Sequence, residues 1–404
     1  MDKVQAQYER WIYPQPIEDL EAWVAGGAFS VGDARECGDI FWPATGYREG
    51  MNILVAGCGA NQAARYALQH PTATVTGIDL SEASLAHEEK LKAKHGLKNL
   101  TLHRMRLEEI SKLGETFDFI AASGVLHHLP DPVAGLTALG GVLDRDGVIF
   151  VMVYGRYGRA PVYMMQDLFR TLGMTSQTDE ELALVKETIR LLPKGHLLHN
   201  YASRSTDMKF DAGLVDLFLH QQDRPYSVPE VMEFVHDSGL AFQGWVEPMY
   251  YNPDASIPEN HPLYRRLEQL SDPDRWAAME LFAGFQSRHD FCVCRTDRPL
   301  DSYYIDFVHP EFPNRAIPIM PTSSLTPAAG GKPAIVTGVR VPPLTLPPPL
   351  VAIFQQIDGI RTIAECLAAA PVNVPPEALR QHGLRFFRSL WRTGHITFRL
   401  KETS

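Results

Sequence analysis

The stretch ILVAGCGANQAA at residues 53–64 ends a hydrophobic run in two glycines and then continues into helix-forming residues. This pattern is typical of a buried parallel strand that is followed by a nucleotide-binding turn. The spacing is not that of a dinucleotide site, because the third glycine of G-x-G-x-x-G falls on Gln62. Gly57 and Gly59 still let the backbone come close to a ligand, since neither carries a Cβ.

An acidic residue follows the next strand pattern. In GIDLS, Asp79 lies 22 residues after Gly57, and a carboxylate at about this place can accept hydrogen bonds from both ribose hydroxyls of a nucleoside. A ribose acceptor without a phosphate cradle favours a nucleoside ligand that lacks a pyrophosphate.

Strand and helix patterns alternate along residues 51–154. Five short hydrophobic runs are separated by helical segments, and the helix predicted at 81–96 opens on a serine and closes on a glycine. Two further strand patterns follow, one after the helix that Ser227 begins and one at 289–297. Repeated βαβ units imply an open sheet with helices on both faces. We therefore predict an α/β fold with a Rossmann-like, seven-stranded, mostly parallel sheet.

The remaining chain is predicted to add a cap and a small domain. Amphipathic helical residues interrupt the α/β pattern at 156–225, where a cap over the strand ends would be built. Nine prolines fall within 317–349, a composition that suits an extended linker. Three helix patterns and a strand follow. The predicted segments are an N-terminal arm at 1–50, the α/β domain with its cap at 51–298, a proline-rich linker at 299–349 and a small domain at 350–404.

Composition excludes several classes of protein. The 404-residue chain is too long for one ordinary core, and its 45% hydrophobic and 21% charged residues suit a soluble globular protein. A net charge of −10 without a Lys/Arg-rich run disfavours a nucleic-acid or membrane partner. No signal region or membrane span is evident. Of five cysteines, two alternate in DFCVCRT and would point to opposite faces of a strand. We predict reduced thiols, no metal site and a cytoplasmic location.

Four motifs occur in order: ILVAGCGANQ at 53–62, VTGIDLSEASL at 75–85, FDFIAASGVLHHLPDP at 117–132 and DGVIFVMVYG at 146–155. Together they resemble the successive motifs of class I S-adenosylmethionine (SAM)-dependent methyltransferases. The resemblance covers residues 51–154. It implies SAM as the cofactor, and a reaction for which the protein supplies mainly proximity and orientation.

The resemblance also implies which residues contact the cofactor. They are Gly57, Cys58 and Gly59 for the methionine portion, Asp79 for the ribose, Leu80 for the adenine, and Ser123, Gly124 and Val125 near the sulfonium.

Three positions depart from the family's pattern. Val55 stands where the family often has an acidic residue, and Arg106 stands near the place of an Asp that reaches the adenine amino group. Met105 or Arg106 is therefore predicted to stack on the adenine ring. Asn61 stands where the family often has a third glycine, which is tolerable because Asn accepts a positive φ better than most residues.

Two groups of residues have alternative interpretations. His127 or His128 could be a general base near the methyl group, since an imidazole titrates near neutrality, or either could be structural. Tyr8, Trp11 and Tyr13 could fold over the cofactor as an aromatic gate, or they could only anchor the leading segment.

The motif after the fourth strand restricts the acceptor. SGVL differs from the [D/N]-P-P-Y motif of family members that methylate amide or base amino groups. We predict methyl transfer to an oxygen or nitrogen of a small molecule or of a peptide or protein side chain. Acceptor specificity is predicted to reside in Met164, Met165, Leu168 and Phe169 of the cap and in Tyr250 and Tyr251 beyond the sixth strand.

The C-terminal segments IDGIRTIAEC and GHITFRL resemble small winged-helix modules, including the PqqD-like domains that hold peptides in some maturation enzymes. The match is short and depends on Asp358, Gly359, Thr362, Ile363 and Gly394. Such a domain could dock a peptide or protein acceptor, form a homodimer or only stabilise the first domain. Two other functions stay open: a non-catalytic SAM-binding regulatory protein, and an NAD-dependent oxidoreductase, against which the missing third glycine counts.

Overall fold

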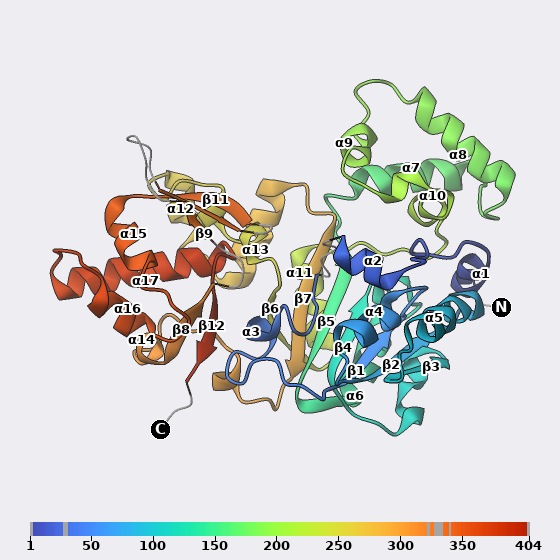
Figure 1. The fold of residues 1–404 in the computed structure, drawn as a ribbon. Helices are drawn as coiled ribbons and strands as arrows, with labels where there is room; N and C mark the ends of the chain where they lie inside the picture. The colour runs from blue at the N-terminus through green and yellow to red at the C-terminus, as the bar shows by residue number, and fades with distance from the viewer. Residues whose placement is uncertain (1–2, 27–30, 321–323, 327–333, 339–340, 402–404) are drawn as a thin grey trace. The chain divides into compact units, whose positions relative to one another are not determined.

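The strand β1 (Asn52–Ala56) lies inside a seven-stranded sheet, and all but its first residue are fully buried (Figure 1). It pairs in parallel with β2 (Thr74–Asp79) on one side and β4 (Phe117–Ser123) on the other. The full order is β3-β2-β1-β4-β5-β7-β6, with β7 antiparallel to β5. The other strands are β3 (Leu100–Arg104), β5 (Leu143–Tyr154), β6 (Leu240–Trp245) and β7 (Arg288–Arg295). The predicted seven-stranded, mostly parallel α/β sheet is confirmed.

The computed structural model describes residues 3–26, 31–320, 324–326, 334–338 and 341–401. The chain forms two compact units. The first comprises Met1–Gly32, Glu49–Phe242 and Ala283–Asp297, and the second comprises Asp33–Arg48, Gln243–Phe282 and Arg298–Ser404. The second unit therefore includes residues that the sequence analysis assigns to the arm and to the α/β domain.

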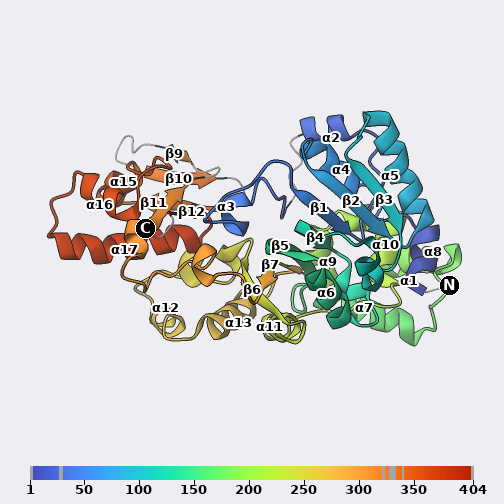
Figure 2. The same cartoon turned by 90° about the horizontal axis from the view of Figure 1, so that it is seen from below.

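Helices of the first unit cover the sheet on both faces (Figure 2). The strand order changes direction between β1 and β4, and right-handed crossovers then place the helices before and after this point on opposite faces. One face carries α4 (Gln62–Gln69) and α5 (Glu82–His95), and the other carries η1 (Leu107–Leu113), α6 (Pro132–Gly141) and α11 (Val228–Asp237). Such a switch point leaves a crevice at the carboxyl ends of the strands.

Local sequence explains where α5 begins and ends. The Ser81 hydroxyl accepts a hydrogen bond from the backbone N–H of Ser84 at 3.1 Å and caps the first turn. Gly96 ends the helix in the left-handed conformation, with φ +64°. Both ends lie where the sequence predicts them.

The insertion at 156–225 forms a group of helices with a hydrophobic core of their own, drawn in green in Figure 1. They are α7 (Ala160–Thr171), α8 (Asp179–Leu191), α9 (Leu198–Ala202), η3 (Asp207–Lys209) and α10 (Asp211–Phe218). Met165 and Phe169 of α7 are buried in this core. Met164 and Leu168 are 48% and 38% exposed and do not line the pocket described below, and the role predicted for them in acceptor specificity stays a prediction.

The N-terminal segment is bonded to the first turn of α5. In α1 (Lys3–Arg10), the Glu9 carboxylate accepts hydrogen bonds from the backbone N–H groups of Glu82 (2.7 Å) and Ala83 (3.1 Å). A helix leaves its first N–H groups without internal partners, so Glu9 satisfies two of them. The segment continues into α2 (Leu20–Ala25), which Asp19 caps.

The first turn of α4 is closed by a residue of α5. Asn61 precedes α4 but makes no capping bond. The buried Glu88 carboxylate accepts hydrogen bonds from the N–H groups of Ala63 (2.9 Å) and Ala64 (2.8 Å) instead. Burial raises the pKa of Glu88 to about 8, against the opposing effect of the two backbone donors.

The second unit combines small sheets with helices. β9, β10 and β11 form an antiparallel sheet, and β12 pairs antiparallel with β8. The elements are α3 (Gly38–Phe41), η4 (Pro248–Tyr250), η5 (Pro253–Ala255), α12 (Pro262–Leu267), α13 (Asp272–Ala283), η6 (Leu300–Ser302), α14 (Phe312–Arg315), β8 (Ala316–Ile319), β9 (Ser324–Thr326), β10 (Ala334–Gly338), β11 (Val341–Leu346), α15 (Pro348–Phe354), α16 (Ile363–Ala369), α17 (Pro376–Arg392) and β12 (Thr397–Leu400). Four of these strands fall in the predicted linker, of which residues 321–323, 327–333 and 339–340 lie outside the described residues.

Turn chemistry accounts for most residues on which the winged-helix resemblance depends. The Asp358 carboxylate accepts hydrogen bonds from the two N–H groups of residues 360 and 361. Gly359 and Gly394 have φ of +74° and +77°, and Thr362 forms a capping box at the start of α16. The likeness of this part to a winged-helix or PqqD-like module stays a prediction.

Two findings bear on the expectations from composition. All five cysteines are buried and none is in a disulfide. Within the ranges that the structure describes, no helix combines the length and the apolar character needed to cross a membrane.

Glu88 is expected to make the stability of the chain depend on pH. Its pKa is about 8 in the folded chain against an ordinary 4.5, so folding favours the protonated form. The protonated Glu88 therefore stabilises the folded chain fully at a pH below the ordinary pKa, and this stabilisation is lost as pH rises through the pKa of the folded chain. Denaturant titrations at several pH values measure the free energy of unfolding of the wild type and of Glu88→Gln. Between the two pKa values, the difference (wild type minus variant) should fall by up to about 1.4 kcal/mol per pH unit.

The neighbouring Glu89 provides the control. It lies on the same helix but its side chain is 55% exposed, so Glu89→Gln should retain the pH dependence of the wild type. A pH-independent difference between wild type and Glu88→Gln would contradict the prediction.

Candidate cofactor and methyl-transfer site

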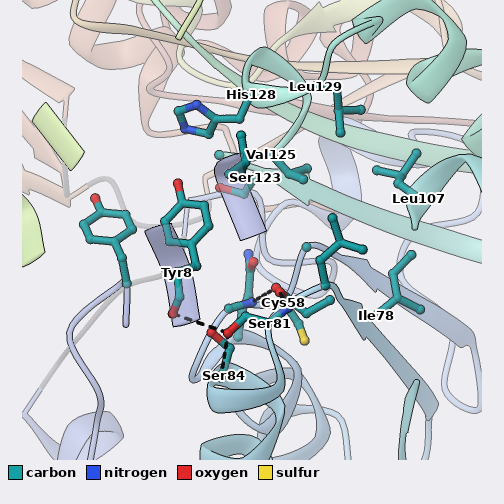
Figure 3. A pocket seen from close by; sticks show the side chains of 18 of the residues that line it. Tyr8, Cys58, Ile78, Ser81, Ser84, Leu107, Ser123, Val125, His128 and Leu129 are labelled. Carbon is teal, nitrogen blue, oxygen red and sulfur yellow. Dashed lines mark hydrogen bonds between the residues drawn. The ribbon is translucent and has the colours of Figure 1, made fainter. Parts of the chain in front are cut away.

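A pocket opens at the carboxyl ends of β1, β2 and β4 in the first unit (Figure 3). The turn after β1, the end of β2, the segment after β3, the loop after β4 and the N-terminal segment all line it. The pocket therefore lies where the strand order changes direction, which is where open α/β sheets bind ligands.

The thirteen residues that the sequence assigns to the cofactor all line this one pocket. They are Tyr8, Tyr13, Gly57, Cys58, Gly59, Asn61, Asp79, Leu80, Met105, Arg106, Ser123, Gly124 and Val125. Of the two candidate bases, His128 lines the pocket and His127 does not. The fold thus brings the assigned residues together, while their contacts with SAM stay a prediction.

Other lining residues escaped the sequence analysis. Most of them flank the assigned ones along the chain: Val4, Gln5, Pro14, Gln62, Arg65, Ile78, Ser81, Ser84, Leu107, Glu108, Leu129 and Pro130. Met152 and Tyr154 come from the end of β5. The sequence could have predicted these two residues, because the carboxyl ends of neighbouring parallel strands face the same crevice.

Both glycines of the turn are required by geometry. Gly57 and Gly59 have φ of +65° and +55°, a region that L-residues rarely adopt. A Cβ on Gly57 would lie 2.6 Å from Cγ2 of Val125, and one on Gly59 would lie 2.9 Å from Cδ of Pro14. The loop after β4 and the N-terminal segment therefore both approach the bare backbone of this turn.

Asn61 holds the N-terminal segment on the turn. Its Oδ1 accepts a hydrogen bond from the N–H of Ile17 at 2.7 Å, and its Nδ2 donates to the carbonyl of Gln15 at 3.0 Å. The expected reason for an Asn at this place was its tolerance of positive φ, but its φ is −142°. The positive-φ explanation is therefore wrong, and the structure shows instead that the Asn61 amide makes these two contacts.

Asp79 joins β2 to the glycine turn. Its Oδ2 accepts from the N–H of Gly59 and its Oδ1 from the N–H of Ser81, both at 2.8 Å. Burial raises the pKa of the Asp79 carboxyl, and these backbone donors oppose the rise. Each carboxylate oxygen has a second lone pair, so Asp79 can shape the turn and still accept a hydrogen bond from a ribose.

A hydrogen bond assigns the tautomer of His128. Its Nδ1 lies 3.0 Å from the carbonyl of Gln222, so Nδ1 carries the proton and Nε2 has a lone pair when the ring is neutral. The Gln222 side chain donates back to the carbonyl of His128 at 2.9 Å. A residue near the end of the cap insertion thus fixes the orientation of an imidazole at the pocket.

His127 has a different environment from its neighbour. It is fully buried, and burial together with the charge of His128 lowers the pKa of His127 well below its usual value. It therefore stays neutral at physiological pH.

The cap contributes a carboxylate close to the pocket. Asp216 of α10 accepts hydrogen bonds from the hydroxyls of Tyr8 (3.0 Å) and Tyr154 (3.4 Å), both of which line the pocket. Burial raises the pKa of Asp216, and the charge of His128 opposes the rise. Three segments far apart in sequence thus form one buried polar group.

Only two of the three residues of the predicted aromatic gate lie at the pocket. Tyr8 and Tyr13 line the pocket, whereas the Trp11 ring packs against the cap core and donates from Nε1 to the carbonyl of Gln177 at 3.2 Å. Tyr251, expected to contact the acceptor, is buried in the second unit and stacks on Trp245. Trp11 and Tyr251 are thus packing residues.

Comparison with known proteins identifies the domain. A family model described as a methyltransferase domain matches residues 54–149. An uncharacterized protein of Synechococcus sp. is 28% identical over 296 residues, which are 72% of this chain and 66% of that protein. The ubiquinone biosynthesis O-methyltransferase of Haemophilus ducreyi is 29% identical over 120 residues, which are 29% of this chain and 50% of that enzyme. The chain thus spans about two thirds of the first relative and about half of the second.

Among solved structures, PKMT2 from Rickettsia typhi has a TM-score of 0.63 at 13% identity and covers 92% of this chain and 76% of its own. Its complex with AdoHcy has a TM-score of 0.62 at 15% identity, with coverage of 93% and 76%. At such identity the likeness concerns the fold, which is the seven-stranded α/β fold of methyltransferases. Residues 54–149 therefore form the core of a SAM-dependent methyltransferase domain, and SAM is its cofactor.

Proposed function

We propose that the protein transfers the methyl group of SAM to an oxygen or nitrogen of a small molecule or of a peptide or protein side chain. The observation that carries the proposal is His128, an imidazole with a lone pair on Nε2 at the pocket that the thirteen assigned residues line. A regulatory protein that only senses SAM has no need of a proton acceptor there.

We place the cofactor by the residues that line the pocket. The methionine portion lies along Gly57 and Gly59, and the ribose hydroxyls donate to the remaining lone pairs of Asp79. The adenine lies between Leu80 and the Met105–Arg106 pair. The sulfonium then lies near Ser123 and Val125, close to His128, as the arrangement of these side chains in Figure 3 supports.

The chemistry is an in-line displacement at the methyl carbon. As the acceptor atom attacks, a hydroxyl or amine loses a proton, and Nε2 of His128 takes it. The Nδ1–H bond to the Gln222 carbonyl stabilises the imidazolium that forms. His127 does not line the pocket, so we assign the base to His128 alone.

We place the acceptor on the side of His128 that faces the cap. Tyr8, Tyr154 and Asp216 supply hydroxyl and carboxylate groups there, which can orient an acceptor that carries O–H or N–H donors. A cytoplasmic location, a homodimer and the absence of a nucleic-acid partner remain expectations from composition.

Asp79→Ala should weaken the binding of S-adenosylhomocysteine by on the order of 2–3 kcal/mol, about fiftyfold, because one or two charge-assisted hydrogen bonds to the ribose are lost. Isothermal calorimetry measures this loss. Asp118→Ala is the control: the Asp118 carboxylate accepts from the N–H of Asn52 at 2.8 Å, at the opposite end of β1. Unchanged affinity in Asp79→Ala would refute the ribose assignment.

Gly57→Ala should give a folded chain that binds S-adenosylhomocysteine at least about tenfold more weakly. Its Cβ would meet Val125 at the pocket floor, in addition to the strain at φ +65°. Gly96→Ala is the control, since Gly96 has φ +64° but open space around its Cβ. It should lose stability and keep its affinity. Equal losses of affinity in both variants would mean that strain, not the pocket, is responsible.

His128→Asn should lower the rate of methyl transfer by roughly 10²–10⁴-fold and change the affinity for S-adenosylhomocysteine only slightly. Asparagine keeps an N–H donor toward the Gln222 carbonyl and lacks the lone pair of Nε2. The measurement is transfer of labelled methyl from SAM into a cell extract that contains a metal chelator. His127→Asn should reduce the rate far less.

Two results of this experiment are decisive. A full rate in His128→Asn would show that His128 is not the base. No labelled product with the wild type, despite SAM binding, would favour the non-catalytic regulatory function instead.

A further inference from the structure

Two buried side chains beside the pocket have hydrogen-bonding atoms without partners. His127 and the side chain of Asp223 are each 0% exposed. Among the residues that the structure describes, Oδ1 of Asp223 has no hydrogen-bond partner, and the ring nitrogens of His127 make no hydrogen bond of good geometry, although the Met152 backbone lies close enough to oppose the fall in the pKa of His127. Buried polar atoms are rarely left in this state, because the cost of removing them from water is then not offset. A ligand bound between the two side chains would satisfy these atoms.

The backbone holds these two side chains next to His128. Arg224 N–H donates to the carbonyl of His127 at 3.2 Å, and the Gln222 side chain donates to that of His128. One nitrogen of each histidine and one oxygen of Asp223 lie within 4.8 Å of one another. The two rings are 4.1 Å apart and inclined at 58°, so they are not stacked in parallel.

One atom of His128 and one of Asp223 are held by hydrogen bonds of the kind found in known metal centres. Nδ1–H of His128 donates to the Gln222 carbonyl, which orients the ring and leaves Nε2 to bind. Oδ2 of Asp223 accepts from Nε2 of Gln166 at 3.1 Å and from the Arg159 guanidinium at 3.4 Å. Metal-binding histidines and carboxylates are fixed by outer hydrogen bonds of this kind.

A neighbouring group, His128, Asp216 and His220, meets the same distance limit. In this group, however, His220 carries its proton on the nitrogen that would have to bind the metal ion. Nδ1 of His220 accepts a hydrogen bond from the N–H of Gln222 at 3.0 Å. The neutral His220 ring therefore carries its proton on Nε2 and has no lone pair there for a metal ion. The Tyr8 hydroxyl also lies between His220 and Asp216, 3.3 Å and 3.0 Å from them.

We propose that His127, His128 and Asp223 bind one divalent transition-metal ion of the zinc class. Two imidazoles and a carboxylate are ligands that such ions prefer, and three protein ligands leave a coordination position open, as in catalytic sites. Because His128 also lines the cofactor pocket, the open position can take a water or an acceptor oxygen. Ligand spacing along the sequence predicts no such site, since Asp223 lies far from the histidines.

The ion and the proton compete for the same lone pair. An ion on Nε2 of His128 prevents this atom from acting as the base that we propose for methyl transfer. The test of the metal site therefore uses neither SAM turnover nor an acceptor. Its failure would leave the proposed function untouched, whereas metal binding through His128 would mean that only the metal-free chain can use His128 as the base.

The experiment is metal binding by the full chain after removal of bound metal with a chelator. Titration with Co²⁺ should show one ion per chain and the visible absorption of nitrogen and oxygen ligands, and Zn²⁺ should displace it. Asp223→Asn and His127→Asn should each weaken binding at least about tenfold, because loss even of an outer partner costs about 10–100-fold.

His220→Asn is the matched control. The oxygen of asparagine can accept from the N–H of Gln222 in place of Nδ1, and the affinity for Co²⁺ should stay within a few-fold. Circular dichroism and S-adenosylhomocysteine binding verify that each variant is folded, and two separate ligand variants guard against misfolding of one.

Three outcomes would overturn the proposal: no stoichiometric ion in the wild type, equal loss of binding in His220→Asn, or unchanged binding in both ligand variants. A thiolate-to-cobalt charge-transfer band would place the ion on cysteines and would also overturn it.

Discussion

The loops after β1 and β4 approach each other so closely that no Cβ fits at Gly57, where it would lie 2.6 Å from the Val125 side chain. This constraint exists because β1 and β4 are neighbouring parallel strands whose carboxyl ends meet at the point where the strand order reverses. The turn must then adopt positive φ at both glycines. The result is a pocket floor of bare backbone, against which a ligand can lie closely.

Segments distant in sequence complete the pocket over this floor. Asn61 uses its amide to hold residues 15–17 and makes no capping bond to α4. Glu88 of α5 supplies the cap instead, and burial raises its pKa because a carboxylate inside the fold is poorly solvated. One substitution in the glycine motif thus connects the N-terminal segment, the turn and the helix behind it.

The two adjacent histidines show how burial divides roles that sequence cannot separate. His128 lies at the pocket, with its tautomer set by the carbonyl of Gln222, near the end of the cap insertion. His127 is fully buried, with one ring nitrogen within 4.8 Å of an Asp223 oxygen. Because the cap segment closes over both, the same hydrogen bonds that orient His128 for proton transfer also bring Asp223 to the histidine pair.

The sequence by itself determined the α/β sheet and the ends of α5, and thirteen of the residues that it assigns to SAM line one pocket, while their contacts with SAM stay a prediction. These depend on strand periodicity, capping and motif spacing, which are local, and parallel strands bring their carboxyl ends together without further information. Only the tertiary structure decided which histidine faces the pocket, why residue 61 is an asparagine, and that Trp11 and Tyr251 are packing residues. It also decided that Asp216 and Asp223 lie beside the site, because contacts between segments distant along the chain leave no periodic trace in either segment.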